Sequence, residues 1–147
     1  MHVKKKLLTK IGYEVVNIDN IPKESGALLI FYHATFPLDC GLLISKYLIK
    51  YKRKILAIVD KVVYTLPGYQ TFIEALEHES GSIETCVNTL KRGDLLVIYP
   101  GGVREAVLSD SSNYQVCWRN RAGFATVALE AKCVCIKIFF ILAKLLI

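Results

Sequence analysis

A histidine and an aspartate that follow the first apolar run of the chain have the types and the spacing of a proton-transfer pair. His33 comes directly after the run 27–32, and five residues separate it from Asp39. An imidazole titrates near neutral pH, so it can accept the proton of a hydroxyl group. A carboxylate in the first turn of the next helix could fix the imidazole tautomer and stabilise the imidazolium. The alternative is a polar exit from the core beside an acid that complements a helix dipole.

A second group of residues that could bind a ligand follows the apolar run 95–98. Its two glycines let a backbone approach a ligand closely. The arginine after them offers a planar fork of donors for phosphate or carboxylate. The alternative is an ordinary glycine turn with a surface arginine and glutamate. The candidate substrate-binding residues of this group are Tyr99, Pro100, Gly101, Gly102, Arg104 and Glu105.

Other catalytic signatures are missing from the sequence. It contains neither the Gly-x-Ser-x-Gly elbow of serine hydrolases nor the Gly-Lys-Ser/Thr of P-loop proteins. The five cysteines have no Cys-x-x-Cys spacing, so we predict small buried hydrophobic residues in a reducing compartment and no metal site. Cys40 is near His33 in the sequence, but nothing there indicates the lowered thiol pKa that a nucleophile needs.

The composition favours an association with membranes over one with nucleic acid. A chain of 147 residues suffices for one domain with a core. Hydrophobic residues make up 53% of it, the mean hydropathy is +0.37 and the formal net charge is +6. A basic and apolar chain suits an anionic membrane face or anionic ligands. We expect no nucleic-acid partner, because the basic residues are not interleaved with aromatic residues.

Signals for targeting and for membrane insertion are weak. The basic start is not followed by the apolar core of a secretory signal peptide, and no run of about 20 apolar residues could span a bilayer. The helix expected after Pro37 carries a basic stripe of Lys46, Lys50, Arg53 and Lys54. Such a helix could lie on an anionic membrane, or the stripe could be only a solvated face.

Alternating apolar strands and amphipathic helices predict an α/β fold with a mostly parallel central sheet flanked by helices. In such a sheet, ligands bind beyond the carboxyl ends of the strands. His33 and Gly101 both come at such ends, which predicts that they contribute to one site. The expected strands span 13–18, 27–32, 55–59, 95–99 and 133–140, the expected helices span 37–54, 67–77, 82–93 and 121–132, and a polar loop is expected over 103–118.

Five short motifs occur in a fixed order along the chain: His33-Ala34-Thr35-Phe36-Pro37-Leu38-Asp39, Leu66-Pro67-Gly68, Arg92-Gly93-Asp94-Leu95-Leu96, Tyr99 to Ala106, and Arg121-Ala122-Gly123-Phe124-Ala125. Together they resemble the glycerolipid acyltransferase superfamily, which has the lysophosphatidic acid acyltransferase-like fold. In particular the chain is similar to the transmembrane protein 68 branch, near the type-2 diacylglycerol acyltransferases. The resemblance covers residues 11 to 140, and its most specific part is Pro-Gly-Gly-Val-Arg-Glu-Ala at 100–106.

The resemblance implies a membrane-associated enzyme of triacylglycerol biosynthesis. It would transfer a fatty acyl group from acyl-CoA to a hydroxyl of a mono- or diacylglycerol-like lipid, at the cytosolic face of the endoplasmic reticulum membrane. Acyl-CoA would be the co-substrate, with no cofactor and no metal. By the same likeness, His33 would take the proton of the acceptor while Asp39 holds His33, and the residues from Tyr99 to Glu105 would shape the substrate pocket.

The chain also departs from the family pattern. Five residues instead of the usual four separate His33 from Asp39, and the usual Phe-Pro-Glu-Gly block reads Tyr-Pro-Gly-Gly, so that the acidic role would pass to Glu105. We expect residues 1–147 to form a single acyltransferase-like domain that lacks the amino-terminal membrane segment and the carboxyl-terminal part. A truncated, non-catalytic membrane-associated fragment or pseudoenzyme of this fold is the alternative. A hydrolase, in which water replaces the alcohol, is a further one.

Overall fold

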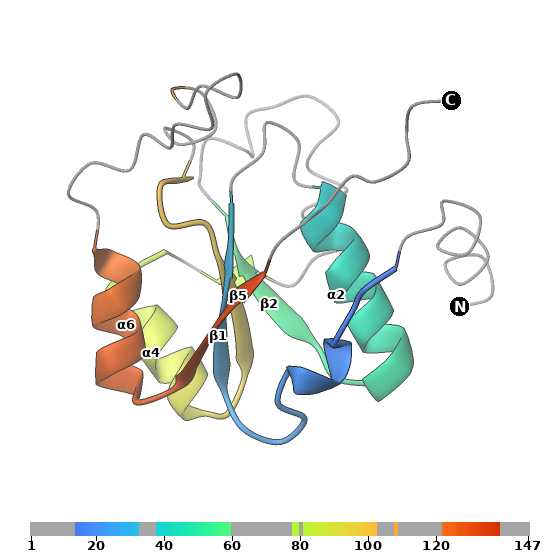
Figure 1. The fold of residues 1–147 in the computed structure, drawn as a ribbon. Helices are drawn as coiled ribbons and strands as arrows, with labels where there is room; N and C mark the ends of the chain where they lie inside the picture. Colours follow the sequence, from blue (N-terminus) through green and yellow to red (C-terminus); the bar gives the residue numbers. More distant parts are fainter. Residues whose placement is uncertain are drawn as a thin grey trace.

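A five-stranded parallel sheet forms the centre of the protein (Figure 1). The computed structural model describes residues 14–32, 38–59, 78–79, 81–102, 108 and 122–138. The strands lie in the order β3-β2-β4-β1-β5, and neighbouring strands run parallel. The predicted parallel α/β sheet is therefore confirmed. The elements are η1 (Ile18–Asn20), β1 (Ala27–Phe31), α2 (Leu38–Tyr51), β2 (Ile55–Ile58), β3 (His78–Glu79), α4 (Ile83–Lys91), β4 (Leu95–Ile98), α6 (Gly123–Ala131) and β5 (Val134–Ile138).

Helices cover both faces of the sheet. Helix α2 lies on one face, and α4 and α6 lie together on the other (Figure 1). Successive residues of β1 alternate between two cores: Leu29 and Phe31 pack on the side of α2, whereas Leu28 packs with residues of α4 and α6. The strand is therefore buried on both sides, which explains why its sequence is an unbroken apolar run.

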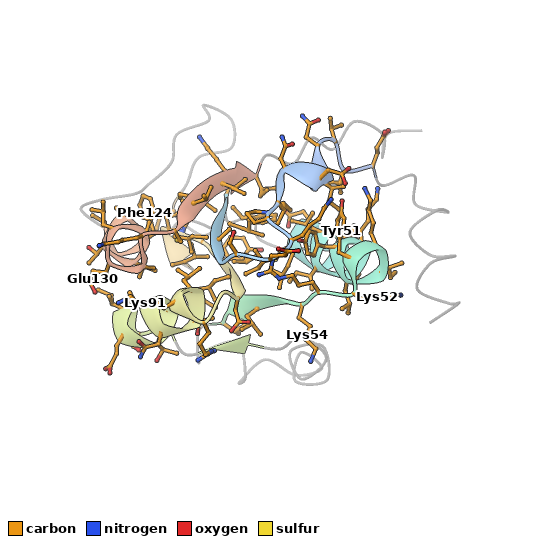
Figure 2. The ribbon with its side chains drawn as sticks, turned by 90° about the horizontal axis from the view of Figure 1, so that it is seen from below. Tyr51, Lys52, Lys54, Lys91, Phe124 and Glu130 are labelled. Carbon is orange, nitrogen blue, oxygen red and sulfur yellow. The ribbon has the colours of Figure 1, made fainter. Side chains whose placement is uncertain are left out.

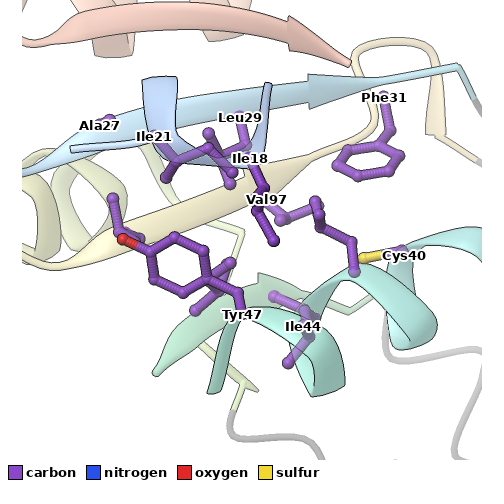
Figure 3. Packing of buried hydrophobic residues seen from close by; sticks show 13 residues of the cluster. Ile18, Ile21, Ala27, Leu29, Phe31, Cys40, Ile44, Tyr47 and Val97 are labelled. Atoms are coloured by element: carbon purple, nitrogen blue, oxygen red, sulfur yellow. The ribbon is translucent and has the colours of Figure 1, made fainter. Parts of the chain in front are cut away.

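The core between α2 and the sheet fixes the position of this helix. Leu43 and Tyr47 of α2 are fully buried there, in the same cluster as Val97 of β4 (Figure 3). Cys40 and Phe31 lie at one end of this cluster and Tyr47 lies at the other end (Figure 3). Burial of apolar surface stabilises such packing by about 25 cal/mol per Å². The first turn of α2 is thus held against the carboxyl end of the sheet.

The segment before β1 is not a strand. The prediction of a strand over 13–18 is wrong for the described residues, because a turn leads there into the 3-10 helix η1. Asn17 adopts a left-handed backbone conformation with a φ of 57°, which asparagine tolerates better than most residues and which interrupts an extended chain. The amide of Asn20 then donates to the carbonyl of Asn17 (3.0 Å) and closes the turn.

Helix α4 begins and ends where the sequence predicts. Ser82 is its N-cap, and the Ser82 hydroxyl accepts a hydrogen bond from the amide of Thr85 (3.1 Å). Gly93 follows the end of the helix with a φ of 93°, a conformation that glycine adopts without strain. These two local signals need no tertiary contact, which is why the sequence alone reveals them.

The remaining described elements agree with the prediction to within a few residues. The strands expected at 27–32, 55–59, 95–99 and 133–140 correspond to β1, β2, β4 and β5, and the helices expected at 37–54 and 121–132 correspond to α2 and α6. The helix expected at 67–77 and nearly all of the loop expected at 103–118 lie outside the described residues. Strand β3 was not predicted, because two residues are too few for an apolar alternation. Among the described helices, none has the length and apolar character that a membrane crossing requires.

Candidate active site

The carboxyl ends of β1 and β4 lie side by side at one edge of the sheet. Ile30 pairs with Ile98 in parallel register, so the chain leaves both strands in the same direction. His33 follows the end of β1 by two residues, and Gly101 follows the end of β4 by three. The two motifs that the sequence assigns to one site therefore start from adjacent points of the fold.

The structure describes part of each motif. The described candidates are Asp39, Tyr99, Pro100, Gly101 and Gly102, whereas His33, Arg104 and Glu105 lie outside the described residues. Asp39 therefore represents the first motif in the described part of the chain, and the residues from Tyr99 to Gly102 represent the second. The predicted proton-transfer pair depends on the distance between His33 and Asp39. Because His33 lies outside the described residues, this pair stays a prediction.

Asp39 is a buried acid in the first turn of α2. Only 7% of its surface is exposed, although aspartate is rarely buried in proteins. The amides and the dipole at a helix N-terminus favour a negative charge at this position. The next buried residues of the same face, Cys40 and Leu43, anchor the turn against the sheet. Asp39 is therefore placed by a packed helix, which suits a group that has to orient another side chain.

The side chain of Tyr99 reaches from the end of β4 to the first turn of α2. Its ring lies against the ring of Phe31 with a centroid distance of 5.9 Å. Its hydroxyl oxygen is shielded from solvent. Burial raises the pKa of the Tyr99 hydroxyl, and the nearby Cys40 and Asp39 raise it further. The phenol is therefore neutral, and it lies close enough to Asp39 to be influenced by the charge of this acid.

Cys40 completes this buried group. Burial raises the pKa of its thiol to about 12, a hydrogen bond with Tyr99 lowers it, and the charge of Asp39 raises it again. The thiol is therefore protonated at neutral pH, and a protonated thiol is a poor nucleophile. This finding agrees with the sequence, which gave no support to a cysteine nucleophile.

A tight turn connects Tyr99 to the glycines of the second motif. The amide of Gly102 donates to the carbonyl of Tyr99 (3.0 Å). Gly102 has a φ of 58°, a left-handed conformation that favours glycine. Gly101, between them, is buried. The turn needs its second glycine for conformational reasons alone, so a ligand is not required to explain that residue.

The opposite end of α2 is tied to the segment that precedes β1. The hydroxyl of Tyr47 donates to the carbonyl of Pro22 (2.8 Å). The guanidinium of Arg53 donates to the carbonyls of Pro22 (2.8 Å) and Ser25 (3.0 Å), and also to that of Gly93. These bonds lie at least two helical turns from Asp39, because Tyr47 comes eight residues later in α2, which corresponds to about 12 Å along the helix axis.

Two residues of the predicted basic stripe therefore make contacts within the protein. Lys50 forms an ion pair with Asp19 at 2.9 Å, and Arg53 binds backbone carbonyls. Tyr51 and Lys52, at this end of α2, lie on the side of the molecule that faces the viewer of Figure 2. Neither interpretation of the stripe anticipated that two of its members hold the amino-terminal segment.

The four described cysteines divide into two classes, and Cys117 lies outside the described residues. Cys40 and Cys86 are buried, as predicted, whereas Cys133 is half-buried and Cys135 is exposed. The prediction of burial is wrong for Cys135 because β5 lies at the edge of the sheet, where no further strand of the described part covers it. Within that same part of the chain, no three side chains of His, Cys, Asp or Glu gather in the way that a metal ion requires.

Sequence reasoning missed the contributions of Phe31 and Cys40 to the site. The sequence predicts Phe31 only as part of an apolar strand and Cys40 as a small buried residue, without a place in the site for either of them. Their contact with Tyr99 depends on the lateral order of β1 and β4 and on the docking of α2. One local signal could have indicated that Cys40 lies near the site: it directly follows Asp39 at the start of a helix.

Comparison with known proteins places this arrangement in a family. The family model described as "Acyltransferase" matches residues 12–140. A protein of Gallus gallus named "DGAT1/2-independent enzyme synthesizing storage lipids" is 46% identical to the chain over 128 residues, and its Homo sapiens namesake is 40% identical. Each alignment covers 87% of this chain but only 38% and 39% of these relatives, so the chain spans less than half of their length.

No solved structure matches the chain. The family model nevertheless spans both motifs and all the described strands. The resemblance inferred from the five motifs is therefore confirmed at the level of the family. The chain belongs to the acyltransferase family.

Proposed function

We propose that the protein is an O-acyltransferase that moves a fatty acyl group from acyl-CoA to a hydroxyl of a glycerolipid. His33 is the general base, and Asp39 orients it. The acceptor is a lipid of the mono- or diacylglycerol type, so that the product belongs to triacylglycerol biosynthesis. The observation that carries the proposal is that the two motifs follow the paired carboxyl ends of β1 and β4 at one edge of a parallel sheet, in a chain that the acyltransferase model matches.

The proposed reaction is a single acyl transfer without a covalent enzyme intermediate. The neutral imidazole of His33 removes the proton of the acceptor hydroxyl while the oxygen attacks the thioester carbonyl. The carbon–oxygen bond of the new ester forms, and the carbon–sulfur bond of acyl-CoA then breaks. The imidazolium returns its proton to the departing thiolate, which leaves as the free thiol of CoA. The carboxylate of Asp39 stabilises the imidazolium between these two proton transfers.

The chemistry of the second motif supports a substrate pocket at the same edge. The turn from Tyr99 to Gly102 brings backbone without bulky side chains to the end of β4. Arg104 adds a fork of donors for a phosphate of CoA or of a lipid headgroup, and Glu105 supplies the acidic group of the pocket. The buried and protonated Cys40 thiol favours a direct transfer over an acyl-cysteine route.

A lipid substrate also favours a reaction that takes place at a membrane surface. The related proteins of Gallus gallus and Homo sapiens are named as enzymes that synthesise storage lipids. A chain with 53% hydrophobic residues and a net charge of +6 suits the anionic, cytosolic face of a membrane. We place the reaction at the endoplasmic reticulum, with acyl-CoA and the glycerolipid as partners and with no nucleic acid, metal or cofactor.

Replacement of the proposed base tests the function directly. The full chain is incubated with diacylglycerol vesicles and labelled acyl-CoA, and labelled triacylglycerol is measured. We expect His33→Ala to reduce turnover at least about 100-fold, the usual contribution of general base catalysis. Tyr47→Phe is the matched control, because it removes a buried hydroxyl bond at the far end of α2.

Three other results would overturn this proposal, each in a different way. Unchanged turnover of the His33→Ala variant would remove the proposed mechanism. Binding of the chain to vesicles with no turnover above background would identify a non-catalytic membrane-associated fragment. Release of labelled fatty acid in the absence of an acceptor would identify a hydrolase.

A further inference from the structure

We propose that the aromatic pair of Phe31 and Tyr99 positions the two motifs of the candidate site relative to each other. Both side chains are positioning residues, which act through the backbone that follows them. The inference rests on the proposed function, because it assigns the two rings a role in the same reaction. It makes Phe31, to which the sequence assigns no place in the site, a determinant of the catalytic rate.

The two rings meet where β1 and β4 end. Ile30 pairs with Ile98 in the parallel register of these strands. Phe31 and Tyr99 come directly after these two residues in the chain. Their ring centroids are 5.9 Å apart and the ring planes are inclined by 55°, which lies within the range of favourable aromatic pairs. The ring contact therefore continues the alignment of the two strands beyond their paired backbones.

Core packing holds this contact from the side of α2. Phe31 is 2% exposed and belongs to the cluster that contains Cys40 and Leu43, and Tyr99 packs against the same cluster. Cys40 and Phe31 lie at the same end of it (Figure 3). Protein cores are close-packed, so a buried ring has little room to shift. Because the Tyr99 hydroxyl oxygen is also shielded from solvent, we expect both side chains to affect the reaction through the backbone and not through contact with substrate.

A short stretch of backbone connects each ring to one motif. Only Tyr32 lies between Phe31 and His33 in the sequence. The carbonyl of Tyr99 accepts the hydrogen bond from the amide of Gly102 (3.0 Å), which closes the glycine turn. A shift of one strand end against the other would therefore change the separation of the proposed base and the glycine turn, while the turn itself stays closed.

Such a shift should lower kcat and leave KM nearly unchanged. The glycine turn keeps its own hydrogen bond, so the pocket that it shapes still binds substrate in the ground state. Proton transfer needs His33 within hydrogen-bond reach of the acceptor hydroxyl. A displacement of about 1 Å can reduce the rate of a catalysed step by up to about 100-fold.

Kinetics of the full chain test this role, with acyl-CoA and diacylglycerol vesicles as substrates. We expect Phe31→Leu and Tyr99→Leu each to lower kcat about tenfold and to leave both KM values within about twofold. Because the rings act as one unit, the double variant should have the kcat of the slower single variant. Tyr99→Phe keeps the ring and should retain kcat within about twofold. Leu28→Val is the matched control, because it removes core packing from the same strand on the opposite face of the sheet.

Hydrogen exchange of the Gly102 amide tests the same contact without turnover. This amide is bound to the carbonyl of Tyr99, so its exchange reports how well the position of Tyr99 is held. We expect Phe31→Leu to speed this exchange about fivefold or more relative to the amides of β4, measured by NMR on the folded protein. Leu28→Val should leave the ratio within about twofold of the parent.

Each measurement has a result that would overturn the inference. Equal kcat in Phe31→Leu and Leu28→Val would mean that Phe31 only fills the core. A tenfold loss of kcat in Tyr99→Phe would assign the role to the hydroxyl and not to the ring. Unchanged exchange of Gly102 in Phe31→Leu would refute the positioning of the turn. A parent chain without turnover would refute the proposed function instead, and the exchange of Gly102 would still decide whether the ring pair holds the turn.

Discussion

The ring of Tyr99, just beyond the end of β4, packs on the ring of Phe31, the last residue of β1, with 5.9 Å between the ring centroids. This contact joins the ends of two neighbouring parallel strands at the edge where the candidate site lies. Phe31→Ala should therefore lower the free energy of unfolding by about 3 kcal/mol, through lost burial and a residual cavity. Urea unfolding of the two proteins measures the difference.

The next residue along the chain provides the control for this prediction. Tyr32 is 49% exposed, so Tyr32→Ala should change the free energy of unfolding by less than about 0.5 kcal/mol. Equal losses in the two variants would show that the Phe31 contact contributes nothing specific.

The thiol of Cys40 should be inert in the folded protein. Burial raises its pKa to about 12, so it stays protonated well above neutral pH, and alkylating reagents attack only the thiolate. Cys135 is exposed and should be modified by iodoacetamide at about pH 8, although its own pKa is also raised, first by partial burial and then by Cys133. Mass spectrometry of peptides from the native and urea-unfolded protein checks the difference. Labelling of Cys40 at the rate of Cys135 in the native protein would contradict the assigned burial.

The attachment of η1 to α2 should depend on pH. Hydrogen bonds from Tyr51 and then from Lys50 lower the pKa of Asp19 below its ordinary value. A lowered pKa in the folded state means that the unfolded chain binds this proton more readily. The stabilisation is therefore complete above the ordinary aspartate pKa and is lost as the pH falls through the folded value.

Comparison with Asp19→Asn isolates this group. The variant should unfold at a lower urea concentration than the parent at neutral pH, and the two midpoints should converge at about pH 2, where the carboxyl is protonated in both states. A gap that persists unchanged in acid would show that the charge of Asp19 is not responsible.

Gly26 should tolerate no side chain. A Cβ at this position would overlap the carbonyl oxygen of Leu90 and crowd that of Asp94, and backbone atoms cannot move aside as a flexible side chain can. Gly26→Ala should thus lower the free energy of unfolding by about 1–3 kcal/mol. Gly123 is the matched control, because a Cβ there meets nothing within 4 Å, and Gly123→Ala should leave stability unchanged or slightly raised. Thermal unfolding of both variants measures these effects, and an equal Tm for Gly26→Ala and the parent would contradict the prediction.

Local signals explain how much of the fold could be predicted. Ser82 and Gly93 bracket α4 through a capping bond and a left-handed turn, and both effects act within a few residues. The two-sided burial of β1 leaves a direct trace in its unbroken apolar sequence. The segment around Asn17 has strand-forming residues as well, but its course follows from one backbone conformation that composition does not reveal.

The site was predictable only as far as topology determines it. Parallel strands place their carboxyl ends at one edge, so the proximity of the regions that follow β1 and β4 could be inferred from the element order. The environment of a side chain depends instead on which strand lies beside which and on how α2 docks. The assignment of Tyr99 to the substrate-binding residues stays a prediction, and the structure adds that its ring packs on Phe31 and that its hydroxyl is buried.

The segment that precedes β1 acts as a brace for the later part of α2. The hydroxyl of Tyr47 and the guanidinium of Arg53, just after the helix, both donate to the carbonyl of Pro22, and Arg53 also donates to that of Ser25. A shortened protein without this segment would deprive the Tyr47 hydroxyl of its acceptor. A polar group that loses its partner in this way destabilises the folded state, so we expect truncation ahead of β1 to cost stability even though no strand of the sheet is removed.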